Sequence, residues 1–197
     1  MKRLVLSTLI ALLPIAACAT PAPPADEATV ATATAASTVI FLARHAEAMY
    51  PPPEDAPRNP PLSAMGQDRA DALARLLADA GITLIHSTDY ERTQETAAPL
   101  AALLGLPVAA YDPGDLPGFA AQLSSTPGRH VVLGHSNTTP ELVAALGGEP
   151  GAPIDESIEF DRLYVVVIGA DGAVTTSLLR YGAPTPADWQ ERAAARR

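Results

Sequence analysis

Short apolar runs alternate with helical patterns from Ser37 onward, and this alternation constrains the fold more than any other feature of the sequence. Runs rich in β-branched and aromatic residues predict strands at 38–42, 82–85, 108–111, 130–133, 163–168 and 174–179. Apolar residues at helical spacing predict helices at 66–80, 92–104, 116–123 and 140–146. The order predicts an α/β three-layer sandwich, in which helices flank a mostly parallel sheet. An Asp-Gly turn between the last strands predicts a late antiparallel hairpin.

The N-terminus has the layout of a secretory signal. Lys2 and Arg3 precede an apolar run, 4–17, which is too short to span a bilayer comfortably and ends at Cys18. The Ile-Ala-Ala-Cys sequence at its end resembles a bacterial lipobox, which implies that 1–18 is a lipoprotein-type signal peptide and that lipid on Cys18 attaches the protein to the periplasmic side of the outer membrane. An ordinary signal peptide cut beside the cysteine would instead leave a soluble periplasmic protein. Both alternatives predict export.

The rest of the chain is predicted to consist of a tether, a folded domain and a C-terminal tail. Residues 19–37 are almost entirely Ala, Thr and Pro and are predicted to be a flexible tether. The folded domain is predicted at 38–183, and 184–197 is predicted to be a C-terminal tail without a chemical role. The sequence has 1 cysteine, which excludes a disulfide framework and a zinc site built from several cysteines.

Charge excludes some classes of partner. The chain has 13 Lys and Arg against 22 Asp and Glu, which gives a net charge of -9. This charge repels polyanions, so a nucleic-acid binder or a general binder of anionic membranes is not expected. An anionic ligand therefore needs a local cluster of positive groups.

Polar clusters directly follow three of the predicted strands, at 44–47, 86–92 and 134–138. The carboxyl ends of parallel strands lie at one edge of a sheet, where ligands of such folds bind. Two arginines and two histidines are therefore expected to converge there, namely Arg44, Arg92, His45 and His135. Forked guanidinium donors suit a phosphoryl group, and a neutral imidazole can attack phosphorus.

Four motifs, FLARHAEA, PPLSAMGQDRA, STDYERTQETAAPLA and VVLGHSNTTPELVAALGG, carry a family resemblance. Together they resemble the histidine phosphatases related to cofactor-dependent phosphoglycerate mutase, over most of 38–182. The resemblance implies a phosphoglycerate mutase-like fold without a metal or organic cofactor. It also implies that His45 is the nucleophile that forms a phosphohistidine. Arg44 and Arg92 would bind the phosphoryl group, and His135 would complete the pocket.

The sequence departs from this family at two positions beside the nucleophile. Ala46 stands where the family usually has glycine, and Ala48 stands where many relatives have a polar residue. No motif identifies the acid that protonates the leaving group. Glu47, Asp112 and Asp115 are possible acids by position, and for each a solvated surface carboxylate is at least as good an interpretation.

The remaining histidines have structural interpretations. His86 is predicted to cap its strand or fill a hydrogen-bonding niche, and His130 is predicted to lie on the surface. The loops 48–61 and 111–129 are predicted to determine the substrate. A metal hydrolase that uses His45, Glu47, His86 and His135 is disfavoured, because such a site in a parallel sheet would show more carboxylates.

These features predict a metal-independent phosphatase that hydrolyses a phosphoester or a phosphoramidate. Its partner would be a small phosphorylated substrate or a phosphoprotein. The alternative is a non-catalytic lipoprotein of the same fold that binds phosphate or a phosphoprotein.

Overall fold

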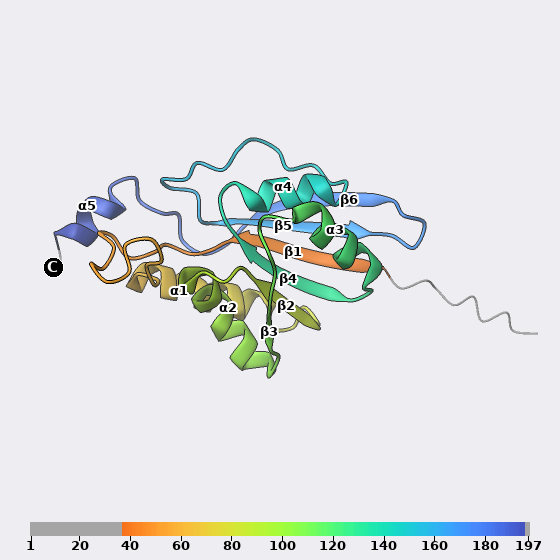
Figure 1. Ribbon diagram of the computed structural model, residues 1–197, viewed down its shortest axis with the longest axis horizontal. Helices are drawn as coiled ribbons and strands as arrows, with labels where there is room; N and C mark the ends of the chain where they lie inside the picture. The colour runs from red at the N-terminus through yellow and green to blue at the C-terminus, as the bar shows by residue number, and fades with distance from the viewer. Residues whose placement is uncertain (1–36, 196–197) are drawn as a thin grey trace, which may run out of the picture. The chain divides into compact units, whose positions relative to one another are not determined.

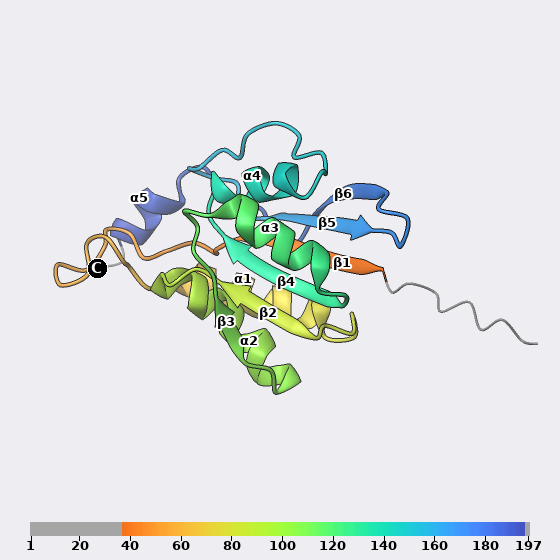
Figure 2. The same cartoon turned by 45° about the vertical axis from the view of Figure 1, so that its right-hand side comes forward.

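Six strands form one sheet in the order β3-β2-β4-β1-β5-β6 (Figures 1 and 2). The strands are β1 Thr38–Arg44, β2 Leu84–Ser87, β3 Val108–Ala110, β4 Arg129–Gly134, β5 Arg162–Ile168 and β6 Val174–Arg180. Strands β1 to β4 pair in parallel, whereas β5 runs antiparallel to both β1 and β6. The predicted mostly parallel sheet with a late hairpin is confirmed.

Helices cover both faces of the sheet (Figure 1). On one side lie α1, Ala64–Leu77, and α2, Glu91–Leu104; on the other lie α3, Leu116–Ser125, and α4, Thr138–Ala145. A short helix, α5, Trp189–Ala194, follows the last strand and lies beyond the end of the sheet at which the parallel strands terminate (Figure 1). This arrangement is the predicted three-layer sandwich.

The central strand β1 is buried on both faces, because it lies between β4 and β5 and between two layers of helices. Ile40 and Leu42 pack into the core beneath α3 and α4. Phe41 and Ala43 point the other way, into the core beneath α1 and α2. The alternation follows from the pleat of a strand and holds the end of β1 rigidly in place.

The computed structural model describes residues 37–195, which belong to one compact unit, Thr34–Arg197. The predicted signal peptide, Cys18 and nearly all of the predicted tether lie outside the described residues. Within the described range, no helix is long and apolar enough to cross a membrane.

The segment predicted to be a tail is partly packed against the domain. Trp189 is buried, and its indole nitrogen donates a hydrogen bond to the carbonyl oxygen of Ser157 at 2.8 Å. Thr185 donates to a carboxylate oxygen of Glu47 at 2.7 Å. These contacts bring the start of the C-terminal segment to the end of the sheet at which β1 terminates.

Candidate active site

His45 directly follows β1 and is held by backbone and ring contacts. Its backbone N–H donates to the carbonyl oxygen of Gly134 at 2.8 Å, which extends the pairing of β1 with β4, and the residue is only 6% exposed. Ring atom Nδ1 lies 2.7 Å from the carbonyl oxygen of Ala46. A carbonyl only accepts, so Nδ1 carries the proton and Nε2 keeps its lone pair. Burial, assisted by the charge of Arg44, lowers the pKa of His45 well below 6.5 and keeps the ring neutral.

Arg92 lies between the two predicted histidines. Its Nε donates to Nε2 of His45 at 3.1 Å, and its Nη2 lies 3.5 Å from Nδ1 of His135. Its guanidinium carbon lies 4.5 Å from the ring centroid of Tyr90, a cation–π contact that orients the side chain. One guanidinium therefore faces a ring nitrogen of each histidine.

Thr96 connects Arg92 to the nucleophile loop. This buried hydroxyl donates to the carbonyl oxygen of Arg92 at 2.7 Å and accepts from the backbone N–H of Ala46 at 3.0 Å. The contact fixes the first turn of α2 relative to His45. The Ala46 side chain is fully buried and belongs to a small cluster with Leu62 and Ala70, so the fold provides space for its methyl group.

His135 completes the cluster at the start of α4. Its ring centroid lies 5.4 Å from that of His45, in an edge-on arrangement. Its Nε2 lies 3.0 Å from the hydroxyl of Thr88, which donates its own proton to Thr93 at 2.9 Å. Nε2 is therefore the donor, and Nδ1 turns its lone pair toward Arg92. Burial and then the charges of Arg92 and Arg44 lower the pKa of His135 to about 4.

The N-terminus of α4 lies at the same place, because Asn137 and Thr138 line the same cavity as His45 and His135. Thr138, the first residue of α4, accepts from the backbone N–H of His135 at 3.0 Å. A Cβ on Gly134 would lie 2.9 Å from the Tyr111 hydroxyl and 3.1 Å from that of Thr138, so glycine lets the turn pass this closely. The positive end of a helix dipole favours an anion at this position.

Arg44 anchors the loop that precedes β5. Its Nη1 donates to the carbonyl oxygens of Glu156 at 2.8 Å and Glu159 at 3.2 Å, and its guanidinium carbon lies 3.9 Å from the ring centroid of Phe160. Burial lowers its pKa to about 10, a shift that the carboxylate of Glu156 partly opposes, so Arg44 stays charged at neutral pH. Part of its donor capacity is thus used within the protein, and direct contact with a phosphoryl group remains a prediction.

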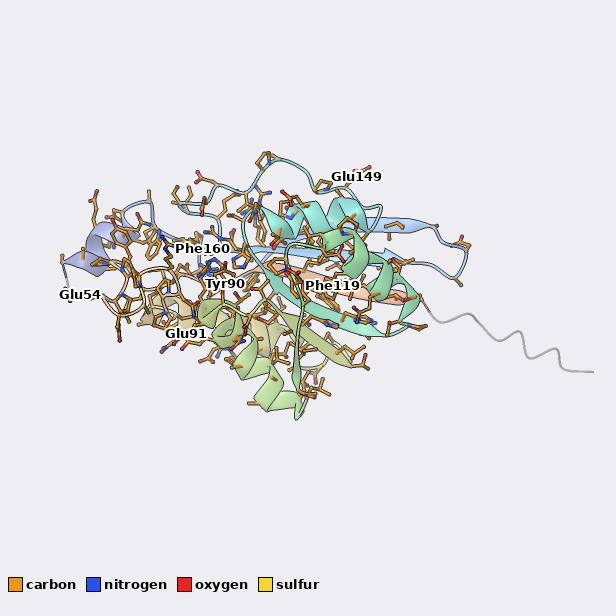
Figure 3. All side chains as sticks on the ribbon, in the orientation of Figure 1. Glu54, Tyr90, Glu91, Phe119, Glu149 and Phe160 are labelled. Carbon is orange, nitrogen blue, oxygen red and sulfur yellow. The ribbon has the colours of Figure 1, made fainter. Side chains whose placement is uncertain are left out.

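His45 opens into two cavities. A polar cavity of about 380 Å³ contains His45, Arg92, His135 and the start of α4. A second cavity of about 330 Å³ contains Arg44, His45 and a set of aromatic side chains. Tyr90 and Phe160, labelled in Figure 3, flank the histidines; Tyr90 directly precedes α2, and Phe160 lies in the loop before β5. The predicted residues Arg44, His45, Arg92 and His135 are therefore gathered at one site.

Glu47, one of the possible acids, lines neither of the two cavities beside His45. The residue is 0% exposed, and Arg69 donates to both of its oxygens, from Nε at 2.8 Å and from Nη2 at 2.7 Å. Together with the bond from Thr185, these contacts use the carboxylate inside the protein. Asp112 accepts from the backbone of Gly114, and Asp115 caps α3. Neither of these aspartates lines the two cavities beside His45.

Glu156 is the carboxylate that lines both cavities beside His45. It lies in the loop between α4 and β5, outside the loops that the sequence analysis assigned to substrate binding. A lone glutamate in a Gly- and Pro-rich stretch carries no sequence signal. The sequence does not indicate Glu156, because its backbone is held over the site by Arg44, which lies 112 residues away in the chain.

We expect Glu47→Gln to lower the free energy of unfolding by about 3–5 kcal/mol, because the change leaves the buried guanidinium of Arg69 without its counter-charge. Urea denaturation measures this loss. Glu54→Gln, at an exposed position in the following loop, is the matched control and should not change stability. Equal stability of both variants would show that the ion pair contributes nothing.

His86 and His130 form a separate buried pair. Nε2 of His86 lies 3.1 Å from Nδ1 of His130, whose Nε2 contacts the carbonyl oxygen of Thr126 at 2.8 Å. The predicted hydrogen-bonding niche for His86 is confirmed, whereas the predicted surface position of His130 is wrong, because that residue is 1% exposed. No group of three or more His, Cys, Asp or Glu within residues 37–195 is arranged to hold a metal ion. Of the side chains named for a metal hydrolase, His45 and His135 lie together, whereas Glu47 is paired with Arg69 and His86 with His130.

Comparison with known proteins agrees with this geometry. The family model of the histidine phosphatase superfamily (branch 1) matches residues 40–113, a range that includes Arg44, His45 and Arg92. No curated protein matches the chain in sequence.

Three solved structures illustrate the structural similarity. The protein histidine phosphatase SixA complexed with tungstate has a TM-score of 0.57 at 20% identity, covering 72% of this chain and 96% of its own. A mycobacterial glucosyl-3-phosphoglycerate phosphatase has a TM-score of 0.53 at 16% identity, covering 75% and 99%. Phosphoglycerate mutase from Plasmodium falciparum has a TM-score of 0.50 at 14% identity, covering 77% and 94%. The fold is phosphoglycerate mutase-like, and over residues 40–113 the sequence is similar to the histidine phosphatase superfamily.

Proposed function

We propose that this protein is a metal-independent phosphatase that hydrolyses a phosphoester or a phosphoramidate through a phosphohistidine on His45. The observation that carries the proposal is the state of the His45 ring. Its Nδ1 proton is held by a backbone carbonyl, its pKa is lowered, and its Nε2 lone pair faces Nε of Arg92 at 3.1 Å. A neutral, oriented and shielded imidazole beside cationic donors suits nucleophilic attack on phosphorus.

Hydrolysis then takes two steps. In the first, Nε2 of His45 forms a bond to phosphorus while the bond between phosphorus and the leaving group breaks. Arg92 gives up its hydrogen bond to Nε2 and donates to the phosphoryl oxygens, beside the ring of His135 and the N-terminus of α4, whose positive end favours the anion. In the second step, water attacks phosphorus, the P–N bond breaks, and inorganic phosphate leaves a neutral His45.

Glu156 is proposed as the acid for the first step. It lines both cavities beside His45, and its charge opposes the burial that lowers the pKa values of Arg44 and Arg92. In its protonated form, Glu156 donates to the leaving oxygen as the P–O bond breaks. The resulting carboxylate accepts a proton from the water that attacks next.

We expect Glu156→Gln to lower kcat/KM for phenyl phosphate by about 10²–10⁴, the usual contribution of general acid–base catalysis. The loss should be much smaller for 4-nitrophenyl phosphate, because its more acidic leaving group needs less protonation. Glu149→Gln, an exposed position in the same loop, is the matched control. Equal losses for both substrates would assign Glu156 a role other than proton donation.

The activity itself is tested by steady-state hydrolysis of phenyl phosphate in the presence of a chelator. We expect turnover to persist and orthovanadate to inhibit competitively. A protein that binds phosphate but turns over no phosphorylated compound would instead be the non-catalytic binding protein considered above. The net charge of -9 argues that nucleic acid is not a partner.

We also propose that the protein is exported and anchored to the periplasmic side of the outer membrane through lipid on Cys18. The support is the arrangement of a basic start, an apolar run and the Ile-Ala-Ala-Cys sequence. We expect the wild-type protein to partition into the detergent phase, and Cys18→Ser to be released or to stay uncleaved. Freely soluble wild-type protein in the periplasm would contradict lipidation while leaving export intact.

A further inference from the structure

A row of aromatic side chains leads away from the nucleophile. The ring of Phe160 lies 6.1 Å from that of His45, Trp189 lies 5.8 Å from Phe160, and Tyr50 lies 6.5 Å from Trp189, all measured between centroids. These three rings line the cavity of about 330 Å³ that begins at His45 and Arg44. Tyr50 is 43% exposed, so the outer end of the row meets solvent.

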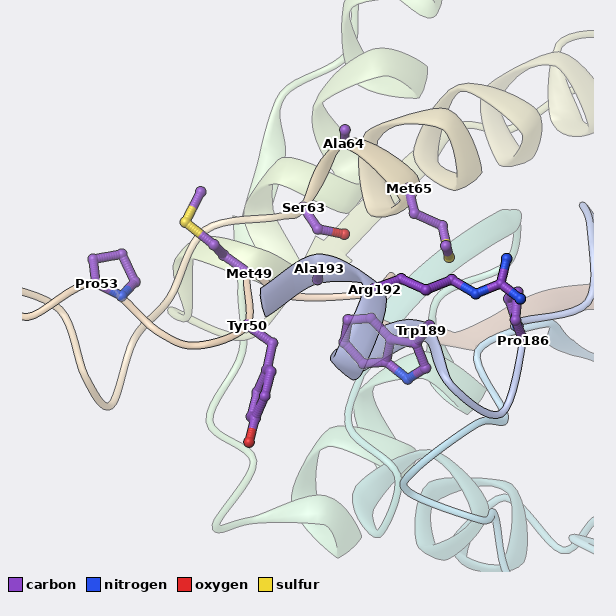
Figure 4. A pocket seen from close by; sticks show the side chains of 10 residues that line it. All are labelled: Met49, Tyr50, Pro53, Ser63, Ala64, Met65, Pro186, Trp189, Arg192 and Ala193. Atoms are coloured by element: carbon purple, nitrogen blue, oxygen red, sulfur yellow. The ribbon is translucent and has the colours of Figure 1, made fainter. Parts of the chain in front are cut away.

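A larger apolar pocket lies on the far side of the same side chains. It has a volume of about 560 Å³ and shares Met49, Tyr50 and Trp189 with the smaller cavity. Figure 4 shows Met49 and Tyr50 on the loop after β1, Met65 on α1 and Trp189 on α5. The cavity next to the reacting centre and the larger apolar pocket are therefore adjacent and share one wall.

Positive charge is confined to the two ends of this path. Among the described residues that line the two cavities, the arginines are Arg44 beside His45 and Arg192 at the far wall. Arg44 is engaged with loop carbonyls, and Nε of Arg192 is paired with Asp188 at 2.8 Å. Between these arginines the two cavities are lined mainly by apolar and aromatic side chains, including Phe160, Trp189 and Tyr50, which offer no partner to a second anionic group on the substrate.

We propose that the substrate is a phosphate monoester of an uncharged, aromatic or otherwise apolar alcohol. This inference rests on the proposed phosphatase function. The phosphoryl group lies between His45, Arg92 and His135, and the leaving group lies along Phe160, Trp189 and Tyr50. Apolar burial and edge-to-face ring contacts hold it there. Longer apolar substituents extend into the pocket of about 560 Å³.

Tyr50 offers the cleanest test, because Trp189 also holds the loop at Ser157 and its removal would disturb Glu156. In the full-length protein, we expect Tyr50→Ala to lower kcat/KM for 2-naphthyl phosphate at least about tenfold more than for acetyl phosphate, a compact donor. Tyr50→Phe should restore the naphthyl activity, because the ring rather than the hydroxyl carries the contact. Leu103→Ala, an exposed apolar position on α2, is the control and should change neither substrate.

The outcomes separate this inference from the phosphatase activity. If Tyr50→Ala lowers turnover of both substrates equally, or of neither, the aromatic row does not hold the leaving group, although the enzyme remains a phosphatase. A wild-type preference for 3-phosphoglycerate over 2-naphthyl phosphate would also overturn the inference. Wild-type protein that turns over none of these compounds would overturn the phosphatase function and the inference together.

Discussion

We expect His45→Ala to lower kcat/KM for phenyl phosphate by about 10⁴-fold or more, because the reaction loses the nitrogen that attacks phosphorus. His135→Ala is expected to retain slow turnover. That change removes the ring that Nη2 of Arg92 contacts, so it disturbs the position of the guanidinium and leaves the ring of His45 in place. The measurement is kcat/KM of folded variants under identical conditions.

His45→Gln controls for the volume lost in the alanine variant. The ring of His45 is buried between Phe160 and His135, so a cavity at this position could alter the site. Glutamine fills much of the space but offers no nucleophilic nitrogen, so it should be as inactive as alanine. Turnover near the wild-type rate in either variant would rule out His45 as the nucleophile.

Arg92→Ala should also slow the reaction strongly. Its guanidinium faces both histidines, and removing one preorganised donor to a developing anion costs about 10²–10³ in rate. Arg92→Lys should recover only part of the activity, because an ammonium cannot reproduce the forked geometry. We also expect weaker inhibition by orthovanadate in both variants.

Arg92→Ala should also shift the pH dependence of kcat/KM. Arg92 is one of the charges that lower the pKa of His45, so its removal raises that pKa. The acidic limb of kcat/KM, where His45 becomes protonated, should therefore move to higher pH. Arg58→Ala, at an exposed position in the loop between β1 and α1, controls for loss of charge alone. Near wild-type turnover of Arg92→Ala would show that the guanidinium does not contact the phosphoryl group.

The fold could be predicted because its strands and helices carry strong local patterns. The β-branched and aromatic residues of β1 alternate between two cores, and Gly105 ends α2 with a left-handed φ of 66°, as the sequence indicates. The convergence of Arg44, His45, Arg92 and His135 follows from parallel pairing alone. The strand predicted at 82–85 is observed at Leu84–Ser87, and just before it the N–H of Arg129 donates to the side-chain hydroxyl of Thr83 rather than to a backbone carbonyl.

The parts that could not be predicted depend on contacts between distant segments. Glu47 lies two residues after the nucleophile, but its carboxylate is bound by Arg69, 22 residues later in the chain. Glu156 reaches the site because Arg44 binds its backbone from 112 residues away. Trp189 enters the cavity wall through its bond to Ser157. Such contacts create no periodicity and no motif within a segment.

Trapping the covalent intermediate tests the central claim most directly. The full-length protein is mixed with phosphate-labelled phenyl phosphate, quenched rapidly without acid, digested and mapped. The mechanism predicts one labelled phosphate on His45, as a phosphoramidate that acid removes and alkali preserves. Label on Ser87, Ser136 or another side chain, or continued turnover without any labelled protein during rapid sampling, would contradict it.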